Sequence, residues 1–260
     1  MTHHHKPRKR FGQHFLSDES ILQEMQRAIA PQPDDHLIEI GPGLGVLTRQ
    51  LVHHVARYDA IEIDRDLIPV LKEAFGHHAN FTLHSQDVLT VDWFQFADNQ
   101  KPRIVGNLPY NISTPLIFAL FDAIDVVEDM HFLLQKEVGL RLAAAVGSSN
   151  YGRLSVMAQY FCEVELLFEV DPDAFTPPPK VDSIFIRMLP RPVSERQAEN
   201  LKVLAMVVAT AFNQRRKTLR NSLRNLIDVE QLIELSIDPK KRAQDLSVAE
   251  FIQIAALVKH

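Results

Sequence analysis

The chain has 260 residues, 46% of them hydrophobic and 23% charged, and it lacks the ~20-residue apolar run of a membrane span, so we expect a globular cytoplasmic protein. Its one cysteine, Cys162, excludes an internal disulfide and also the Cys-x-x-Cys pair of a zinc deaminase. The net charge of −5 is unevenly distributed, because residues 190–260 carry 12 Lys or Arg and 8 Asp or Glu while the remainder carries 16 and 25, which indicates a C-terminal segment that binds a polyanion.

The chain begins with a predicted basic arm at residues 1–16. Its first ten residues are polar and aperiodic, so they would either contact phosphates or form a solvated tail. Apolar residues reappear from position 11, and the end of the arm should therefore dock onto the body of the protein, as an anchor or as part of a ligand site. We predict no metal site, although His3, His4 and His5 could take up a stray ion. The basic residues of the arm are Lys6, Arg8, Lys9 and Arg10.

A glycine-rich turn follows a predicted strand at residues 37–40 and precedes a predicted helix. In the run Gly41-Pro42-Gly43-Leu44-Gly45 the glycines would let the backbone approach a ligand, and the helix would present its first N–H groups to it. A dinucleotide-binding fingerprint would need its third glycine where the chain has Val46. The alternative is a tight turn with a purely structural role.

Acidic residues stand at the ends of the next two predicted strands. Glu62 lies nineteen residues after Gly43, where a doubly wound fold places a carboxylate for ribose hydroxyl groups. Asp64 and Asp66 are alternatives for this role, although Asp66 is better placed to start the following helix. Asp87 follows the other strand, where it could accept a hydrogen bond from an adenine amino group or cap a local turn.

The next predicted strand leads into the run Gly-Asn-Leu-Pro-Tyr at residues 106–110. Pro109 lacks an N–H group and holds Leu108 in an extended conformation, so the strand ends in a stiff turn. The Asn107 side-chain oxygen and the Leu108 carbonyl could then accept both hydrogens of one exocyclic amino group. The Tyr110 ring could stack on the base that carries this group. An ordinary exit from a strand is the alternative, since Asn-x-Pro turns are common.

The remaining strands complete the predicted sheet. They lie at residues 130–134, 160–170 and 183–189. The alternation of strands and helices predicts an α/β fold with a doubly wound, mostly parallel sheet in a domain of residues 17–190. Between the last two strands, Phe175 opens a stiff proline-rich loop. Phe175 could form a second wall for a flipped base, or it could simply pack on the body.

Residues 191–260 are predicted to form a smaller, all-α domain that binds RNA. One basic stretch of this domain contains no acid, and its Leu219 and Leu223 would face the interior. Basic residues would then recur every four positions along one ridge of a helix, where they could bind a phosphate backbone or form a solvated face. Like charges at this spacing repel one another, which favours the polyanion. The ridge comprises Arg216, Arg220 and Arg224, and the predicted RNA contacts also include Arg215 and Lys217.

Together these motifs resemble those of the ribosomal RNA adenine N6-dimethyltransferase family, which has the class I (Rossmann-like) S-adenosylmethionine methyltransferase fold. The resemblance runs from Arg8 to about residue 250 and rests on residues 10–13, 39–45, 106–114, 151–160, 175–183 and 212–223. It implies S-adenosylmethionine as the cofactor. The family usually has Asn at position 14, so the contact implied there is one from the backbone. The implied cofactor-binding residues are His14, Leu16, Gly41, Gly43, Glu62, Asp87 and Asn107.

The resemblance also implies the reaction. The substrate would be a pair of adjacent adenosines in the 3′-terminal hairpin loop of 16S ribosomal RNA, each dimethylated at N6 late in the assembly of the 30S subunit. We expect an enzyme that acts as a monomer, without a metal. A related dimethylase of the large-subunit RNA is one alternative, which the loop at residues 175–183 disfavours. A catalytically idle assembly factor is another, against which the intact run at residues 106–110 argues.

Overall fold

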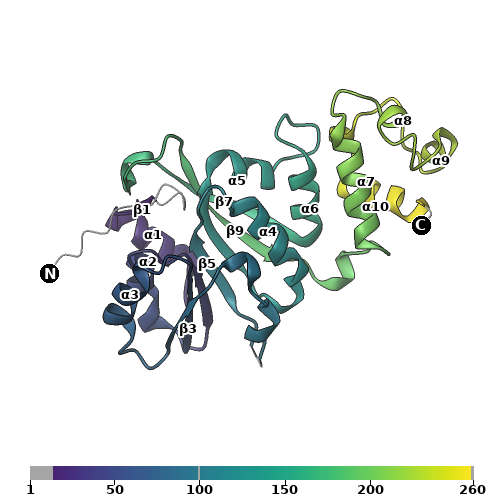
Figure 1. The fold of residues 1–260 in the computed structure, drawn as a ribbon. Coiled ribbons are helices and arrows are strands. Elements are labelled where there is room, and N and C mark those ends of the chain that lie inside the picture. Colours follow the sequence, from purple (N-terminus) through teal and green to yellow (C-terminus); the bar gives the residue numbers. More distant parts are fainter. Residues whose placement is uncertain (1–13, 99, 259–260) are drawn as a thin grey trace. The chain divides into compact units, whose positions relative to one another are not determined.

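The computed structural model describes residues 14–98 and 100–258 (Figure 1). The predictions for the basic part of the arm and for His3, His4 and His5 therefore lie outside the described residues. The chain divides into two compact units, of which the first runs to Gly139 and resumes at Glu165–Pro190. The second contains Leu140–Val164 and the residues from Arg191 onward. The division predicted from the sequence differs, because it placed residues 140–164 in the domain of the sheet.

The strands of the large sheet are β2 (His36–Ile40), β3 (Arg57–Glu62), β4 (Phe81–Ser85), β5 (Arg103–Asn107), β6 (Met130–Gln135), β7 (Cys162–Val170) and β9 (Ser183–Pro190). This sheet is seven-stranded and has the order β4-β3-β2-β5-β6-β9-β7. Adjacent strands from β4 to β6 are parallel, and β9 runs antiparallel to β6. The predicted doubly wound, mostly parallel sheet is confirmed. Its strand order reverses between β2 and β5, where such sheets bind ligands beyond their carboxyl ends.

Helices and short turns connect these strands. The first helix begins after Asp18, whose carboxylate accepts the N–H groups of Ser20 and Ile21 and so caps the helix. The helices of this part of the chain are α1 (Glu19–Ile29), α2 (Val46–Leu51), α3 (Leu67–Phe75), α4 (Ser113–Asp122) and α5 (Lys136–Leu142). The short 3-10 turns are η2 (Val52–His54), η3 (Val88–Thr90), η4 (Trp93–Phe96), η5 (Ile124–Val126) and η6 (Pro172–Ala174).

Buried apolar residues of the first unit pack against both faces of the central strands. Every residue of β2 is buried, as expected for a parallel strand inside a doubly wound fold. Leu37 joins a cluster that contains buried residues of the first three helices, such as Met25, Leu51 and Leu71. The next residue, Ile38, is also buried and points to the opposite face of the sheet. This packing fixes the strands so that their carboxyl ends lie together.

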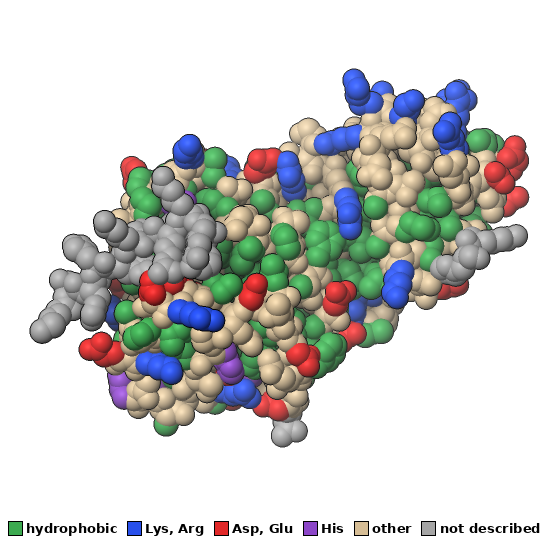
Figure 2. All heavy atoms as spheres, in the orientation of Figure 1, with side chains coloured by type: hydrophobic (Ala, Val, Ile, Leu, Met, Phe, Trp, Pro, Cys, Tyr) green, Lys and Arg blue, Asp and Glu red, His purple; other side chains and the backbone are tan. Residues whose placement is uncertain are grey.

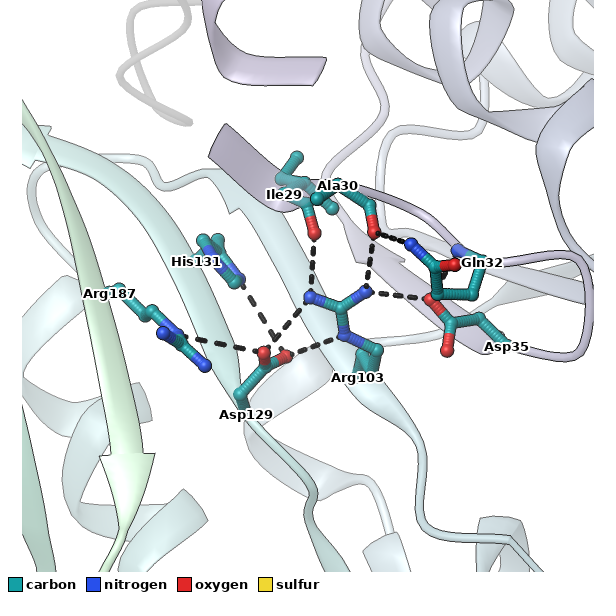
Figure 3. Close-up of polar contacts among 8 residues, drawn as sticks. All are labelled: Ile29, Ala30, Gln32, Asp35, Arg103, Asp129, His131 and Arg187. Carbon is teal, nitrogen blue, oxygen red and sulfur yellow. Dashed lines mark hydrogen bonds and ion pairs between the residues drawn. The ribbon is translucent and has the colours of Figure 1, made fainter. Parts of the chain in front are cut away.

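Charged residues at the amino ends of β2, β5 and β6 pair with one another (Figure 3). Arg103 donates to Asp35 at 2.6 Å and to the two oxygens of Asp129 at 2.9 and 3.0 Å. Arg103 also donates to the carbonyl of Ile29 at the end of α1, at 2.7 Å. Burial lowers the pKa of the neighbouring His131 to about 4, so this imidazole is neutral at pH 7. The cluster therefore ties α1 to three strands at the end of the sheet opposite their carboxyl termini.

A second, two-stranded sheet joins the N-terminal segment to the proline-rich loop. In it, β1 (Phe15–Leu16) pairs antiparallel with β8 (Phe175–Thr176). Ser17 extends this contact, because its N–H group donates to the carbonyl of Ala174 at 2.8 Å. The end of the predicted arm is thus docked onto the body of the first unit.

The helices of the second unit are α6 (Arg153–Phe161), α7 (Leu201–Asn213), α8 (Leu219–Ser222), α9 (Val229–Glu234) and α10 (Val248–Leu257), with turns η7 (Val193–Glu195) and η8 (Ala243–Asp245). α10 begins with a capping box, in which Ser247 and Glu250 each accept the backbone N–H group of the other. Phe212 of α7 and Phe251 of α10 pack with their ring centroids 5.8 Å apart. No helix among the described residues of either unit is long and apolar enough to cross a membrane.

Candidate functional site

A pocket lies at the carboxyl ends of the parallel strands, where the strand order reverses. All of the predicted cofactor-binding residues and the whole of the predicted catalytic motif line it. These residues come from β1 and the residue before it, from the carboxyl ends of β3 and β5, and from the segments that follow β2, β4 and β5, all in the first unit. They are His14, Leu16, Gly41, Gly43, Glu62, Asp87, Asn107, Leu108, Pro109 and Tyr110.

The turn after β2 brings bare backbone to the pocket. Gly41 and Gly43 have φ angles of 64° and 61°, in the left-handed region that side chains disfavour. A Cβ atom at Gly43 would lie 3.1 Å from the ring of Phe15, so this glycine also makes room for the docked β1 strand. The turn therefore has the form predicted for a loop that approaches a ligand closely.

Glu62 lies at the end of β3, and only 5% of its surface is exposed. One carboxylate oxygen accepts the N–H group of Gly43 at 3.2 Å, and the other accepts that of Asp64 at 2.8 Å. Burial raises the pKa of this carboxyl group. Because each oxygen has a further lone pair, Glu62 can close the glycine turn and still accept a hydroxyl group from the pocket. Asp64 is buried outside the pocket lining and Asp66 is exposed, so neither alternative is favoured.

Asp87 follows β4 and can serve both of the roles considered for it. Its Oδ1 atom accepts the N–H group of Leu89 at 3.0 Å and thereby caps η3. Its Oδ2 atom has no hydrogen-bond partner among the residues that the structure describes, and Asp87 lines the pocket. The local cap therefore leaves one oxygen able to accept an amino group.

Some pocket residues escaped the sequence analysis. Ile63 and Leu89 line the pocket with 44% and 40% of their surfaces exposed, and Gln86 lines it too, with its N–H group donating to the carbonyl of Glu62 at 3.1 Å. Large apolar side chains that stay exposed in a pocket suit a flat apolar ligand such as a purine ring. Their positions in the sequence could have indicated them, because Ile63 directly follows Glu62 and Leu89 comes two residues after Asp87.

The run after β5 presents two acceptors on consecutive residues. The side-chain nitrogen of Asn107 donates to the backbone carbonyl of His14 at 3.2 Å, so its side-chain oxygen faces away from the N-terminal segment. No described residue donates to that oxygen or to the carbonyl of Leu108. The N–H group of Leu108 donates to the carbonyl of Leu133 at 2.9 Å. Pro109 has no N–H group with which to compete. The pair can thus accept both hydrogens of one amino group.

Tyr110 is held at its hydroxyl group and faces another ring. Its hydroxyl oxygen lies 2.8 Å from that of Ser183, and burial raises the pKa of the phenol. The ring of His14 stacks on the ring of Tyr110, with centroids 5.7 Å apart and an interplanar angle of 27°. His14 Nδ1 in turn donates to the carbonyl of Pro177 at 2.8 Å. The ring predicted to hold a base is therefore fixed in the pocket and has an aromatic neighbour.

Phe175 is not in the pocket, contrary to the prediction that it forms a second wall for the base. It is only 3% exposed and belongs to the apolar core of the first unit. Its backbone pairs with Leu16 in the two-stranded sheet, so the Phe175 side chain packs into the body. The alternative considered from the sequence, a loop aromatic packed on the body, describes its position.

The predicted helical ridge of arginines is wrong. α7 ends at Asn213 and the short α8 covers only part of the stretch, so Arg216 and Arg224 lie outside any helix. The N–H group of Leu219 donates to the carbonyl of Lys241 at 2.8 Å instead of continuing a helix. Leu219 is fully buried, as predicted, and so is Leu223. The stretch is basic as predicted, but its arginines do not lie four residues apart along one helix.

Two basic residues that the sequence analysis did not select, Lys240 and Arg242, lie beside the predicted basic stretch. Thr218 forms an isolated β-bridge with Arg242, which places the run at residues 240–242 beside the predicted stretch. Figure 2 shows Lys and Arg side chains gathered over the part of the second unit that carries α8. We define the basic patch as the exposed residues Arg216, Lys217, Arg220, Arg224, Lys240 and Arg242. None of these side chains forms an ion pair with a described residue, whereas Lys241 pairs with Glu250 at 3.0 Å.

Arg215 differs from the other predicted RNA contacts. Its guanidinium group donates to the carbonyls of Ser149 and Tyr151, and it lies 3.4 Å from the side-chain oxygen of Gln244. These bonds join three segments of the second unit. Arg215 therefore acts as a clamp within this unit, and we leave it outside the basic patch.

The residues that the structure describes contain no group of three or more His, Cys, Asp or Glu side chains arranged to hold a metal ion. The buried Cys162 is held as a thiol, because burial raises its pKa to about 12. The pocket residues described above offer hydrogen bonding, stacking and close approach of the backbone.

Comparisons with known proteins agree with this arrangement. A sequence profile described as "Ribosomal RNA adenine dimethylase" matches residues 4–260. The ribosomal RNA small subunit methyltransferase A of Marinobacter nauticus is 51% identical over 98% of this chain and 93% of its own length. A dimethyladenosine transferase structure from Plasmodium falciparum is 26% identical, with a TM-score of 0.81 over 93% of this chain and 96% of that one. The structure of the 23S rRNA methyltransferase ErmE is 25% identical, with a TM-score of 0.73, and the match covers 95% of this chain and 100% of that one.

Proposed function

The chain belongs to the ribosomal RNA adenine dimethylase family, and we propose that it dimethylates N6 of two adjacent adenosines in the 3′-terminal hairpin loop of 16S ribosomal RNA. The methyl donor is S-adenosylmethionine. In this proposal the substrate is the RNA within the 30S subunit, late in its assembly.

One observation carries the proposal. The Asn107 side-chain oxygen and the Leu108 carbonyl are two unpaired acceptors on consecutive residues, beside the ring of Tyr110 in one pocket. An adenine amino group has two hydrogens to offer, and its base has a flat face to stack on tyrosine. The target base must leave its own stack to reach the pocket, and Tyr110 would hold it there.

The two acceptors also account for the chemistry that the chain must perform. Adenine N6 is a weak nucleophile, because its lone pair is delocalised into the ring. In the first transfer, hydrogen bonds from both amino hydrogens to Asn107 and Leu108 favour a more pyramidal nitrogen and direct its lone pair, and in the second transfer the one remaining hydrogen keeps one of these contacts, so positioning is the main contribution. S-adenosylmethionine supplies an electrophilic methyl group. The nitrogen becomes acidic once methylated and loses its proton readily, so the site needs no strong base.

The rest of the pocket fits the cofactor. Glu62 can accept ribose hydroxyl groups, and the unpaired oxygen of Asp87 can accept the adenine amino group. The exposed side chains of Ile63 and Leu89 offer apolar surfaces to the cofactor's adenine ring. The glycine turn at Gly41 lets the backbone come close to the ligand, since no side chain intervenes.

The comparisons favour the small-subunit RNA over the large-subunit RNA. Identity to the small subunit methyltransferase A of Marinobacter nauticus is 51%, against 25% to the 23S rRNA methyltransferase ErmE, and both comparisons span nearly the whole chain. We assign the phosphate contacts to the basic patch, because its side chains are exposed and unpaired among the described residues. In this proposal the enzyme acts as a monomer, in the cytoplasm where subunits assemble.

Methyl transfer to isolated ribosomal subunits tests the proposal. Purified protein is incubated with labelled S-adenosylmethionine and small subunits whose target adenosines are unmethylated, with large subunits as the matched control. We expect label as N6,N6-dimethyladenosine at two adjacent positions near the 3′ end of the small-subunit RNA. Label in the large subunit alone would contradict the assigned substrate. Binding without transfer would indicate an idle assembly factor.

A further inference from the structure

A cavity of about 300 Å³ lies within the second unit and shares no residue with the pocket at the carboxyl ends of the strands. It is lined by the end of α5, by the loop before α6 and the first turn of α6, and by residues at and after the end of α7. None of the described residues that line it is acidic. Its basic residues are Arg141, Arg153 and Arg215. The cavity therefore gathers positive charge without a carboxylate in its described lining.

The backbone at the start of α6 adds hydrogen-bond donors to this charge. Leu154 and Ser155 lie in the first turn of α6 and line the cavity, and no described residue accepts a hydrogen bond from the N–H group of either. The residue before the helix is Gly152, which has no side chain with which to cap these groups. The first turn of a helix also carries a partial positive charge. Side chains and backbone thus offer donors in the same cavity.

The carbonyl groups beside the cavity, in contrast, already accept hydrogen bonds. The guanidinium group of Arg215 donates to the carbonyls of Ser149 and Tyr151. The hydroxyl group of Ser155 donates to the carbonyl of Arg141 at 2.5 Å. Because these acceptors are engaged while the first N–H groups of α6 are not, the cavity favours a ligand that brings acceptor oxygens and negative charge. A phosphate group brings both, and its geometry matches the planar guanidinium group of arginine.

The cavity adjoins the basic patch. Arg215 directly precedes Arg216, the first residue of the patch. The Arg215 guanidinium group also lies 3.4 Å from the side-chain oxygen of Gln244, which follows Arg242 of the patch by two residues. An RNA backbone that crosses the patch would therefore meet the cavity beside it, and its phosphates repeat along the chain.

We propose that this cavity binds one phosphate group of the ribosomal RNA backbone. Arg141 and Arg153 supply the charge, the first turn of α6 supplies backbone N–H groups, and Arg215 holds the loop that forms one wall. This inference rests on the proposed function, because it takes RNA as the source of the phosphate. The basic patch is an exposed surface, whereas the cavity is a discrete site in which several donors converge on one group.

Single substitutions in the cavity test the proposal. Arg153→Gln and Arg141→Gln each remove one charge, and the two are also combined in a double variant. Lys202→Gln is the matched control, because Lys202 is an exposed cation on α7 of the same unit that does not line the cavity. The affinity of each full-length variant for unmethylated small subunits is measured at several salt concentrations. Thermal unfolding shows whether each variant is folded, and either single variant can carry the test if the other is not.

We expect Arg153→Gln and Arg141→Gln each to weaken subunit binding about tenfold, as loss of a hydrogen bond to a charged group does. The slope of log affinity against log salt concentration should become less negative by at most about 0.9, the value for one phosphate. In methyl transfer the loss should appear as a higher KM for the subunit. The double variant should lose less than the sum of the two single losses, because both arginines contact the same phosphate. Lys202→Gln should bind like the wild type.

Wild-type affinity in both Arg153→Gln and Arg141→Gln would overturn the inference. Fully additive losses in the double variant would also overturn it, because they would indicate two separate surface contacts. Calorimetry with inorganic phosphate, in the absence of RNA, is a second arm. If the wild type bound phosphate and Arg153→Gln did not, while both bound the subunit equally, the cavity would take a free anion and the assignment to RNA would be wrong. Failure of the proposed function would be seen separately, because the wild type would then transfer no methyl groups to small subunits.

Discussion

The side-chain nitrogen of Asn107 donates to the backbone carbonyl of His14 across 3.2 Å, although 93 positions separate the two residues. This bond decides which end of the amide faces the N-terminal segment, and so leaves the oxygen as an acceptor beside the carbonyl of Leu108. A reversed amide would present hydrogens to the amino group of the base. Docking of the N-terminal segment therefore sets the acceptor pair on which the proposed recognition of the amino group depends.

Asn107→Ala should abolish most methyl transfer while the protein remains folded. The substitution removes one of the two acceptors for the amino group, and loss of one such preorganised group lowers kcat by roughly 10²- to 10³-fold. Thermal unfolding should be nearly unchanged, because Asn107 is only partly buried. Asn111→Ala is the matched control, since Asn111 also lines the pocket but carries no assigned role. Near-wild-type turnover of Asn107→Ala would refute the assignment of the acceptor pair.

Glu62→Gln should weaken the binding of S-adenosylmethionine. Glutamine keeps the shape of the side chain but replaces one acceptor oxygen by a donor, which leaves ribose hydroxyl groups or the backbone of Gly43 without a partner. The expected loss is ~1–3 kcal/mol, measured by calorimetry. Asp66→Asn is the control, because Asp66 is exposed and outside the pocket lining. Unchanged affinity in Glu62→Gln would move the ribose site to another residue.

Glu39→Gln should stabilise the first unit at high pH. Glu39 is 2% exposed, accepts a hydrogen bond from Tyr58 at 2.7 Å, and has a pKa raised by burial from 4.5 to about 7. A raised pKa means that protonation of Glu39 stabilises the fold at low pH, and that this stabilisation disappears as the pH rises through about 7. Glutamine does not titrate, so the free energy of unfolding of the variant relative to the wild type should rise by roughly 2–3 kcal/mol between pH 5 and pH 8.

Trp93 provides the measurement for Glu39→Gln. It is the single tryptophan of the chain, it is 4% exposed, and it lies in the same unit as Glu39, so its fluorescence reports unfolding of that unit in urea. A difference between variant and wild type that is the same at pH 5 and pH 8 would show that Glu39 has an ordinary pKa in the folded chain.

Four residues of the pocket could be predicted from the sequence because they stand at the ends of parallel strands. Gly41, Glu62, Asp87 and Asn107 stand at or just after the carboxyl ends of β2, β3, β4 and β5, and those ends meet at one edge of a parallel sheet. Local patterns were enough to place them. The ring opposite Tyr110 could not be found in this way, because it depends on pairing between β1 and β8.

The basic stretch shows the same limit in the second unit. Its leucines recur at helical spacing and are buried as predicted, yet the N–H group of Arg220 donates to the carbonyl of Pro239 at 3.2 Å. A partner that lies nineteen residues further along the chain overrides the local preference for a helix. The residue types and the burial were predictable, but the path of the backbone depended on this distant contact.

Arg215→Gln should destabilise the second unit, whereas Arg216→Gln should not. The guanidinium group of Arg215 joins the carbonyls of Ser149 and Tyr151, while Arg216 is exposed and forms no ion pair with a described residue. Loss of these bonds should lower the free energy of unfolding of the second unit by about 1 kcal/mol or more, which is measured as a lower thermal midpoint. Arg216→Gln should instead weaken binding to the small subunit at an unchanged midpoint. Equal midpoints for the two variants would contradict the clamp.

The basic patch should bind the small-subunit RNA through its phosphates. The patch variant replaces Arg216, Arg220 and Arg224 by Gln, and the control variant replaces Arg65, Lys72 and Lys101. The control residues are exposed, lie in the first unit, and remove the same charge. Both variants should bind S-adenosylmethionine like the wild type, because neither set lines the pocket.

Salt dependence distinguishes phosphate binding from a general effect of charge. The slope of log affinity for the subunit against log salt concentration should become less negative by roughly 0.7–0.9 for each phosphate that the variant no longer neutralises, so by about 2–3 in the patch variant and by much less in the control. The physical reason is the release of counterions from the RNA, which occurs only where a cation meets a phosphate. If the patch variant kept both the affinity and the slope of the wild type, the patch would be a solvated face. Lys6, Arg8, Lys9 and Arg10 would then become the leading RNA contacts.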